Sequence, residues 1–249
     1  MTTGIPSKKE DFTPRRRRTI DRWIPTLFLL AASISIVTTV GIVATLVGDA
    51  AQFFRQVPLR EVFSTRLAPL AAEPSFGILP LINGTIVTSL IAMLVATPIG
   101  LAAAMYLSEF ASARARGILK PAIELLAGVP TIVYGFFAYS LVTPLLRELI
   151  PSLGAKNALS PGIVMGFMIV PMVTSLSEDA MRSVPASIRE GALALGLTRL
   201  ETTLHVVVPA ALSGIVASIT LGISRAVGET MIVAIASGSS KNFTLDIRE

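Results

Sequence analysis

The chain has no cysteine, one histidine and few charged residues. Without cysteine there are no disulfides, thiol nucleophiles or thiolate metal sites. The single histidine, His205, leaves little scope for metal ligation or histidine-dependent catalysis. Charged residues make up 15% of the sequence, against about 25% in an ordinary soluble domain. These shortages leave no catalytic residues and no metal or cofactor site to predict.

The sequence is correspondingly rich in apolar residues. They make up 52% of the chain, and the mean hydropathy is +0.72. A soluble protein of this size could not hide so much apolar surface, so the expected solvent is lipid. A helix needs about 20 apolar residues to cross the hydrocarbon core. Five runs are long enough and nearly free of charge: Trp23–Gly48, Leu81–Leu107, Leu125–Leu146, Asn157–Ser177 and Thr202–Ser224, the last continuing to about Ala236.

The first 22 residues hold seven of the 21 basic residues. A signal peptide is the competing interpretation, but the uncharged run that follows, Trp23–Gly48, exceeds the about 7–15 residues of a signal-peptide core. We therefore predict a retained membrane span. We interpret the basic block as a signal for membrane topology rather than for nucleic-acid binding.

Basic residues also predict the orientation. With the N-terminus in the cytoplasm, 13 Lys and Arg lie inside and seven outside, with Arg225 in a span. This bias favours a cytoplasmic N-terminus. Five spans then put Glu249 outside, and we expect a sixth span beyond it. The predicted organisation is a basic cytoplasmic tail (1–22), a first transmembrane helix (23–48), an extracytoplasmic segment (49–80) and a permease domain (81–249) with a cytoplasmic loop (178–205).

Proline and glycine interrupt several spans. Pro130 and Gly135 lie close together in the third. Either they reflect the general frequency of Pro and Gly in membrane helices, or they mark a broken helix that lines a cavity. Gly162 and Gly166 form a GxxxG pair, which predicts a close helix contact. Glu178 and Asp179 end the fourth span and are expected at the cytoplasmic interface.

Residues 186–205 predict two short helices. Gly196 suits a helix stop, because glycine adopts the left-handed conformation at little cost. Thr198 is then the cap of a second helix, and Glu201 completes a capping box. Such a helix–turn–helix is either a peg that a partner pushes or a solvated connector.

The spacing in this loop resembles the EAA loop of ABC importer permeases. That pattern is Glu-Ala-Ala, three residues, Gly, nine residues, then aliphatic–x–aliphatic–Pro. The chain has Glu190, Ala192, Gly196, Val206 and Pro209 at these places. It departs from the pattern at Gly191, where the family has alanine. The resemblance implies that Glu190, Gly191, Ala192 and Gly196 couple the permease to an ATPase subunit.

Glu124–Ala138 and Ser224–Gly238 resemble the phosphate-specific permeases, and Asn83–Phe110 resembles the start of their shared permease domain. The sequence GETM at Gly228–Met231 is more similar to the PstC type of these permeases than to its PstA partner. The resemblance implies an all-α membrane protein, the polytopic helical bundle of a type I ABC importer permease with at least five transmembrane helices. It also implies a second, PstA-type permease, PstB-type ATPase subunits (two expected), a PstS-type extracytoplasmic phosphate-binding protein, and a bacterial cytoplasmic (inner) membrane location.

Two charges lie in the last apolar run. Arg225 and Glu229 are four residues apart, which predicts one shared helix face. They are either an ion pair that fixes packing, or Arg225 meets an anion in the pathway while Glu229 holds it in place. A guanidinium suits phosphate oxygens. Polar residues that begin the second span are further candidates for the pathway: Asn83, Thr85, Thr88 and Ser89.

The sequence distinguishes between three classes of function. No GxxxxGK[S/T] phosphate loop occurs in the sequence, so an ABC permease would depend on a separate ATPase. A secondary anion carrier would need its own coupling-ion site, and an intramembrane enzyme would need paired catalytic groups. We therefore predict a phosphate permease, with another oxyanion (sulfate or molybdate) or an ATP-independent carrier as alternatives.

Overall fold

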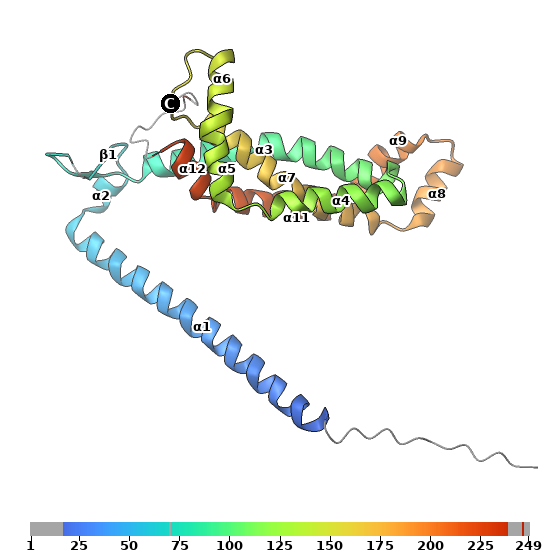
Figure 1. Ribbon diagram of the computed structural model, residues 1–249, viewed down its shortest axis with the longest axis horizontal. Coiled ribbons are helices and arrows are strands. Elements are labelled where there is room, and N and C mark those ends of the chain that lie inside the picture. Colours follow the sequence, from blue (N-terminus) through green and yellow to red (C-terminus); the bar gives the residue numbers. More distant parts are fainter. Residues whose placement is uncertain (1–16, 70, 239–245, 247–249) are drawn as a thin grey trace, which may run out of the picture. The chain divides into compact units, whose positions relative to one another are not determined.

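The computed structural model describes residues 17–69, 71–238 and 246, and the chain forms two compact units, 1–59 and 60–249 (Figure 1). The larger part of the predicted basic tail, residues 1–16, lies outside the described residues. In the first unit a single helix, α1 (Arg17–Gln56), contains the predicted span 23–48. From Trp23 to Gly48 it carries no charged residue, and its most hydrophobic part has no buried residue. A helix of that kind suits a lipid environment.

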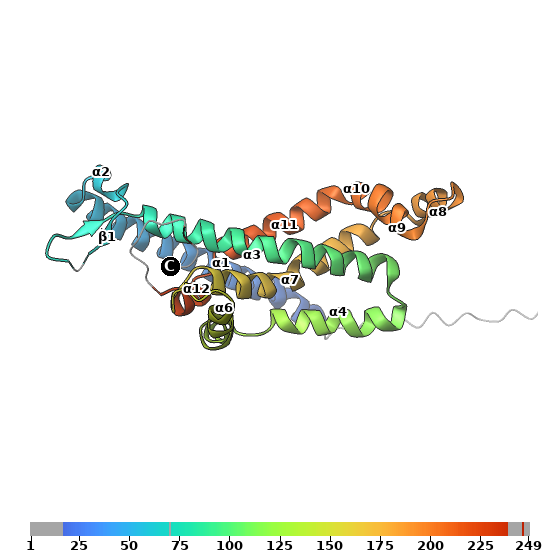
Figure 2. The same ribbon diagram turned by 90° about the horizontal axis from the view of Figure 1, so that it is seen from above.

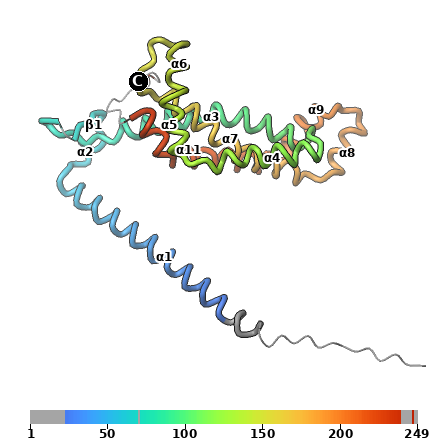
Figure 3. Tube along the Cα trace, in the orientation of Figure 1, coloured from blue at the N-terminus to red at the C-terminus, as the bar shows by residue number. Residues whose placement is uncertain are grey.

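The second unit begins with small elements and continues as a helical bundle (Figure 3). Its helices and strands are α2 (Leu59–Val62), β1 (Leu67–Ala68), β2 (Ser75–Phe76), α3 (Leu79–Met105), α4 (Ala113–Ala127), α5 (Thr131–Phe137), α6 (Thr143–Leu149), α7 (Leu159–Arg182), α8 (Ala186–Ala194), α9 (Arg199–Thr202), α10 (Val208–Ala210), α11 (Leu212–Val227) and α12 (Met231–Ala236). Three π-helical turns lie between helices. They are η1 (Tyr106–Phe110) between α3 and α4, η2 (Ala138–Val142) between α5 and α6, and η3 (Thr203–Val207) between α9 and α10. Strands β1 and β2 pair antiparallel, with Leu67 opposite Phe76.

Three helical stretches are long and apolar enough to cross a membrane singly: Trp23–Gln56, Leu79–Phe110 and Leu159–Arg182. Two bent pairs give five spans if each pair crosses once. The structure differs here from the predicted third and fifth spans. The third is bent by 85° between Ala113–Ala127 and Thr131–Leu149, and the fifth by 73° between Arg199–Ala210 and Leu212–Val227. Pro130 caps the start of α5, and the first break is explained because a proline disfavours the helical conformation of the residue before it.

The core lies where α7 packs along α3, with α11 beside both (Figures 1 and 2). The GxxxG prediction is confirmed. A Cβ placed on Gly162 would lie 2.7 Å from Ile91 Cγ2, and one on Gly166 would lie 2.7 Å from Val95 Cβ. Only glycine allows this approach of α7 to α3. Buried apolar side chains fill the remaining space, among them Ala92, Met165, Ile169 and Val173.

The second unit has two distinct ends. Helices α8 and α9 form one end, and the β1–β2 hairpin, α6 and α12 lie toward the other (Figures 1 and 2). The chain therefore presents the predicted coupling loop and the helices α5, α6 and α12 at opposite ends of one bundle.

Candidate coupling loop and substrate path

Helix α8 ends in the way that its sequence predicts. Gly196 has φ +89°, a left-handed conformation. Its N–H donates to the Leu193 carbonyl at 3.0 Å, and the Leu197 N–H donates to the Ala192 carbonyl at 3.3 Å. These two bonds make a Schellman motif, which satisfies carbonyls left over at the helix end. The predicted stop at Gly196 is confirmed.

Helix α9 starts with the predicted capping box. The Thr198 N–H donates to Glu201 Oε2 at 2.8 Å, and the Glu201 N–H donates to Thr198 Oγ1 at 3.3 Å. The N–H groups of Thr198 and Glu201 at this helix start are thus each bonded to the side chain of the other residue. The helix then continues through η3 and α10 to Ala210. The loop is therefore a defined helix–turn–helix with local stops of its own.

The four predicted coupling residues have different environments. Glu190, Gly191 and Gly196 are exposed, whereas Ala192 is buried. Helix α8 packs against α9 and η3, and Ala192 is its one buried residue. Exposed apolar side chains accompany the three exposed positions: Ile188, Leu193, Leu195 and Leu200. Apolar surface of this kind, rimmed by polar residues, is typical of a docking site.

Arg189 attaches α8 to the bundle, which sequence reasoning missed. Its guanidinium donates to the carbonyls of Val184 at 2.6 Å and Met181 at 2.7 Å. It also pairs with Glu109 Oε1 at 3.2 Å. Glu109 lies in η1, 80 residues earlier, so only the tertiary structure reveals the pair.

A buried carboxylate holds α4 against α7. Glu178 has no exposed side-chain surface, whereas the Asp179 side chain is 60% exposed, and the position of both at the cytoplasmic interface stays a prediction. Glu178 Oε1 accepts from Arg116, and the Lys120 ammonium lies 2.8 Å from Oε2. The second contact is an ion pair without hydrogen-bond alignment. Burial follows because two cations from α4 stabilise the charge.

The predicted shared face of Arg225 and Glu229 is wrong. Helix α11 ends at Val227, and Gly228 caps it. Glu229 Oε1 instead accepts from the N–H groups of Met231 at 3.0 Å and Ile232 at 3.2 Å, so it caps α12. The physical reason is that the next helix start offers Glu229 backbone donors. Among the described residues, no contact between Glu229 and Arg225 supports the prediction that Glu229 holds Arg225 in place.

Arg225 lies exposed on α11. Its Nη2 lies 4.0 Å from Met168 Sδ, and it takes part in none of the ion pairs found in the described part of the chain. A guanidinium in an apolar span is costly without a counter-charge. The position thus retains a cation that an anion could neutralise.

The polar residues of α3 are mostly satisfied by their own helix. Thr85 Oγ1 donates to the Leu81 carbonyl at 3.0 Å, and Thr88 Oγ1 to the Gly84 carbonyl at 2.8 Å. Thr88 and Ser89 are buried, and Asn83 is half-buried. The Ser89 hydroxyl is buried without a hydrogen-bond partner. In this conformation Thr88 and Ser89 face packed helices.

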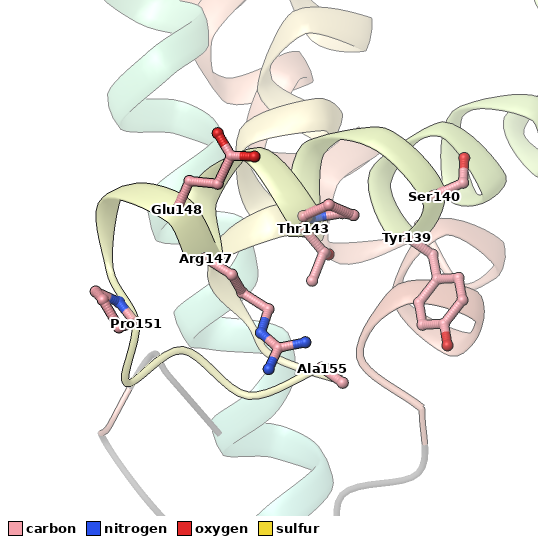
Figure 4. Close-up of a pocket in the computed structure, with 8 residues that line it drawn as sticks. Tyr139, Ser140, Thr143, Arg147, Glu148, Pro151 and Ala155 are labelled. Carbon is pink, nitrogen blue, oxygen red and sulfur yellow. The ribbon is translucent and has the colours of Figure 1, made fainter.

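A cavity of about 640 Å³ lies beside α6 (Figure 4). Figure 4 shows the Arg147 guanidinium pointing toward Ala155 and the Glu148 carboxylate pointing the other way. Tyr139, Ser140 and Thr143 complete much of its wall. None of the predicted pathway or coupling residues lines it. Across the described residues, no group of three or more His, Cys, Asp or Glu side chains is arranged to hold a metal ion.

Comparison with known proteins indicates the same family as the residue spacing of the coupling loop. The family described as "Binding-protein-dependent transport system inner membrane component" matches residues 96–245. The chain is 35% identical to the probable ABC transporter permease protein YqgH of Bacillus subtilis, over 86% of this chain and 69% of that protein. It is 32% identical to the phosphate transport system permease protein PstC of Xylella fastidiosa, over 96% of this chain and 80% of that protein.

A similar match extends to Methanocaldococcus jannaschii. Its probable phosphate transport system permease protein PstC is 32% identical over 77% of this chain and 68% of that protein. The helical architecture with its candidate spans agrees with these matches. The chain therefore belongs to the family of binding-protein-dependent transport system inner membrane components, as a multi-pass ABC permease of the PstC type.

Proposed function

We propose that this chain is the permease subunit of an ATP-driven importer of inorganic phosphate. The observation that carries the proposal is the similarity to phosphate transport system permeases such as the Xylella fastidiosa PstC, which extends over 96% of this chain. An ABC permease implies an ATPase and a substrate-binding partner. We expect these to be PstB-type ATPase subunits and a PstS-type phosphate-binding protein, with a PstA-type second permease.

The coupling loop is the part that contacts the ATPase in this proposal. Its support is the ordered helix–turn–helix between two spans, with the exposed positions Glu190, Gly191 and Gly196 and exposed apolar neighbours. An ATPase groove that accepts this surface would push α8 when ATP binds. The loop then lies in the cytoplasm, as does the N-terminus, and the permease domain is residues 81–249.

Arg225 is the residue that we expect to meet phosphate. Its support is an exposed guanidinium on an apolar helix and no carboxylate partner within the described residues. Glu229 acts one turn away by capping α12 and fixing the turn at Gly228. Asn83, Thr85, Thr88 and Ser89 stay secondary candidates, of which the buried Thr88 and Ser89 would need the packed helices to separate.

The test is uptake of labelled phosphate into proteoliposomes that contain the full-length chain with its partners. We expect uptake that requires ATP and that unlabelled sulfate and molybdate do not inhibit. Arg225→Gln should raise the KM for phosphate about tenfold or more, because a charge-assisted hydrogen bond contributes about 1.5–3 kcal/mol. Arg147→Gln, an exposed arginine outside the predicted path, is the matched control.

Each outcome has one meaning. Uptake without ATP would contradict the ABC mechanism and favour a secondary carrier. Inhibition by sulfate or molybdate would replace phosphate by another oxyanion. An unchanged KM in Arg225→Gln, with the complex assembled, would remove Arg225 from the pathway and leave the function intact.

A further inference from the structure

The Arg189 side chain extends away from its own helix, α8, and bonds the carbonyl end of another helix, α7. It lies in the first half of α8, yet its guanidinium donates to the Met181 carbonyl in the last turn of α7 at 2.7 Å and to the Val184 carbonyl just after α7 at 2.6 Å. The carbonyl end of a helix carries a partial negative charge, so a guanidinium there forms charge-assisted bonds. Any displacement of α8 along or away from α7 therefore stretches these bonds.

The same guanidinium reaches the end of the α3–η1 helix. Arg189 Nη2 lies 3.2 Å from Glu109 Oε1, and the Ser108 hydroxyl donates to the same oxygen at 2.8 Å. The two side chains are only 21% and 12% exposed. A pair shielded to this extent is less screened than a surface salt bridge. One residue of α8 is thus bonded to both α7 and the α3 segment.

An apolar cluster lies at the base of the loop and keeps these elements in register. Its members in helices are Ala104 of α3, Met181 of α7, Val207 of η3 and Ile215 of α11. Val184 and Ala211, which lie between helices, complete it. Close-packed clusters transmit displacement because they do not compress. The ends of three long helices therefore meet where Arg189 is bonded.

We propose that Arg189 is the positioning residue that transmits movement of the coupling helix α8 to α3 and α7. This inference rests on the proposed function, since it assumes that an ATPase pushes α8. Its chemistry is that of a three-way link, in which one guanidinium bonds a carboxylate, a carbonyl in the last turn of α7 and a carbonyl in the α7–α8 connection. A lysine ammonium is a point charge without the planar fork and cannot reproduce the same set of bonds.

The experiment compares four variants in the full reconstituted complex: Arg189→Gln, Arg189→Lys, Glu109→Gln and the control Arg182→Gln. Arg182 is exposed in the last turn of α7, so its loss changes the same charge without touching the link. Each complex is assayed for subunit assembly, ATP hydrolysis and phosphate uptake. We expect Arg189→Gln to assemble and to hydrolyse ATP, while the phosphate moved per ATP falls about tenfold, because it loses charge-assisted bonds.

The other variants sharpen the result. Arg189→Lys should recover part of the coupling, and Glu109→Gln should lose less than Arg189→Gln because the carbonyl bonds remain. The KM for phosphate should stay unchanged while the maximal uptake rate falls, which a defect at the substrate site would not produce. Uncoupling in Arg182→Gln as well, or normal coupling in Arg189→Gln, would overturn the inference. So would losses of assembly, ATP hydrolysis and uptake in parallel.

A second measurement separates this inference from the proposed substrate. Hydrogen exchange in α3 and α7 is followed in the assembled complex with and without ATP. We expect a nucleotide-dependent change in wild type that Arg189→Gln abolishes and Arg182→Gln keeps. If wild type shows that change but imports no phosphate, the proposed function fails and the link stands. If the change persists in Arg189→Gln, the link fails.

Discussion

At the scale of residues, charges in this chain are stabilised by partners from distant segments. Glu178 is completely buried between Arg116 and Lys120, and Arg189 is bonded to Glu109. Neither pair lies within one helix, so each fixes the position of one element against another. Helix α4 depends on this arrangement, because it has no buried residue of its own.

Removing the carboxylate should weaken the α4–α7 contact. Breaking a buried ion pair costs about 3–5 kcal/mol. For Glu178→Gln we expect about 2 kcal/mol, because the Arg116 and Lys120 side chains are 30% and 20% exposed and water relieves part of the loss. The variant should lower the apparent melting temperature of the detergent-solubilised protein.

Asp179→Asn is the matched control. Asp179 also pairs with Lys120, at 2.9 Å, but its side chain is 60% exposed. Exposed pairs contribute about 0–1 kcal/mol, so this variant should melt close to wild type. Equal melting temperatures for the two variants would show that burial of Glu178 does not set the strength of the contact.

At the scale of elements, glycine determines how closely α7 approaches α3. Gly100 lies against Val173, and Gly162 and Gly166 lie against Ile91 and Val95. A hydrogen bond adds to this contact, since Thr174 Oγ1 donates to the Gly100 carbonyl at 3.3 Å, and another joins α7 to α11, between the Ser177 and Ser218 hydroxyls at 2.7 Å. Small residues and interhelical hydrogen bonds are the usual means of helix association in lipid.

Adding one methyl group should separate α3 from α7. A Cβ on Gly166 would lie 2.9 Å from the Ala92 carbonyl oxygen, which is backbone and cannot give way easily. We expect Gly166→Ala to destabilise the protein by about 1–3 kcal/mol, as overpacking does. Thermal unfolding in detergent measures the effect.

Gly117→Ala tests the same substitution without the close contact. A Cβ on Gly117 meets nothing within 4 Å, and the residue lies inside α4. Alanine is favoured over glycine in a helix by about 1 kcal/mol, so this variant should be neutral or more stable. If both variants destabilised equally, the close α3–α7 approach would not explain the loss at Gly166.

At the scale of the whole molecule, topology decides which end of the bundle faces the proposed ATPase. The second unit carries α8 and α9 at one end and α6 at the other (Figure 1). A chain without cysteine is convenient here, because a single introduced cysteine gives a labelling signal with no background from the chain itself. Ser187 in α8 and Ser152 after α6 are both exposed.

We expect Ser187→Cys to react with a membrane-impermeant maleimide only from the cytoplasmic side, and Ser152→Cys only from the opposite side. Spheroplasts and inside-out vesicles present the two sides separately. This result follows from the excess of basic residues that retains the N-terminus inside. Labelling of Ser187→Cys in intact spheroplasts would reverse the proposed orientation, and labelling of both variants from one side would contradict the spans between them.

Local features of the second unit were predictable from the sequence. Gly196, Thr198 and Glu201 act within six residues of one another, so their helix stop and capping box follow from local geometry. The GxxxG contact was predictable for a similar reason, because the spacing places both glycines on one face of α7. The predicted Arg225–Glu229 pair failed because spacing of four residues implies a shared face only while the helix continues, and α11 ends at Val227.

The sequence by itself determined the solvent, the family and the local ends of the coupling loop. Apolar runs of membrane length require lipid, and the loop spacing is read directly along the chain. Only the tertiary structure decided which charges are buried and which helices they join. Glu178 with Arg116 and Arg189 with Glu109 are 62 and 80 residues apart, and no periodicity or capping rule spans such distances. Those pairs form because packing excludes water from a carboxylate, which then requires a cation wherever the fold brings one.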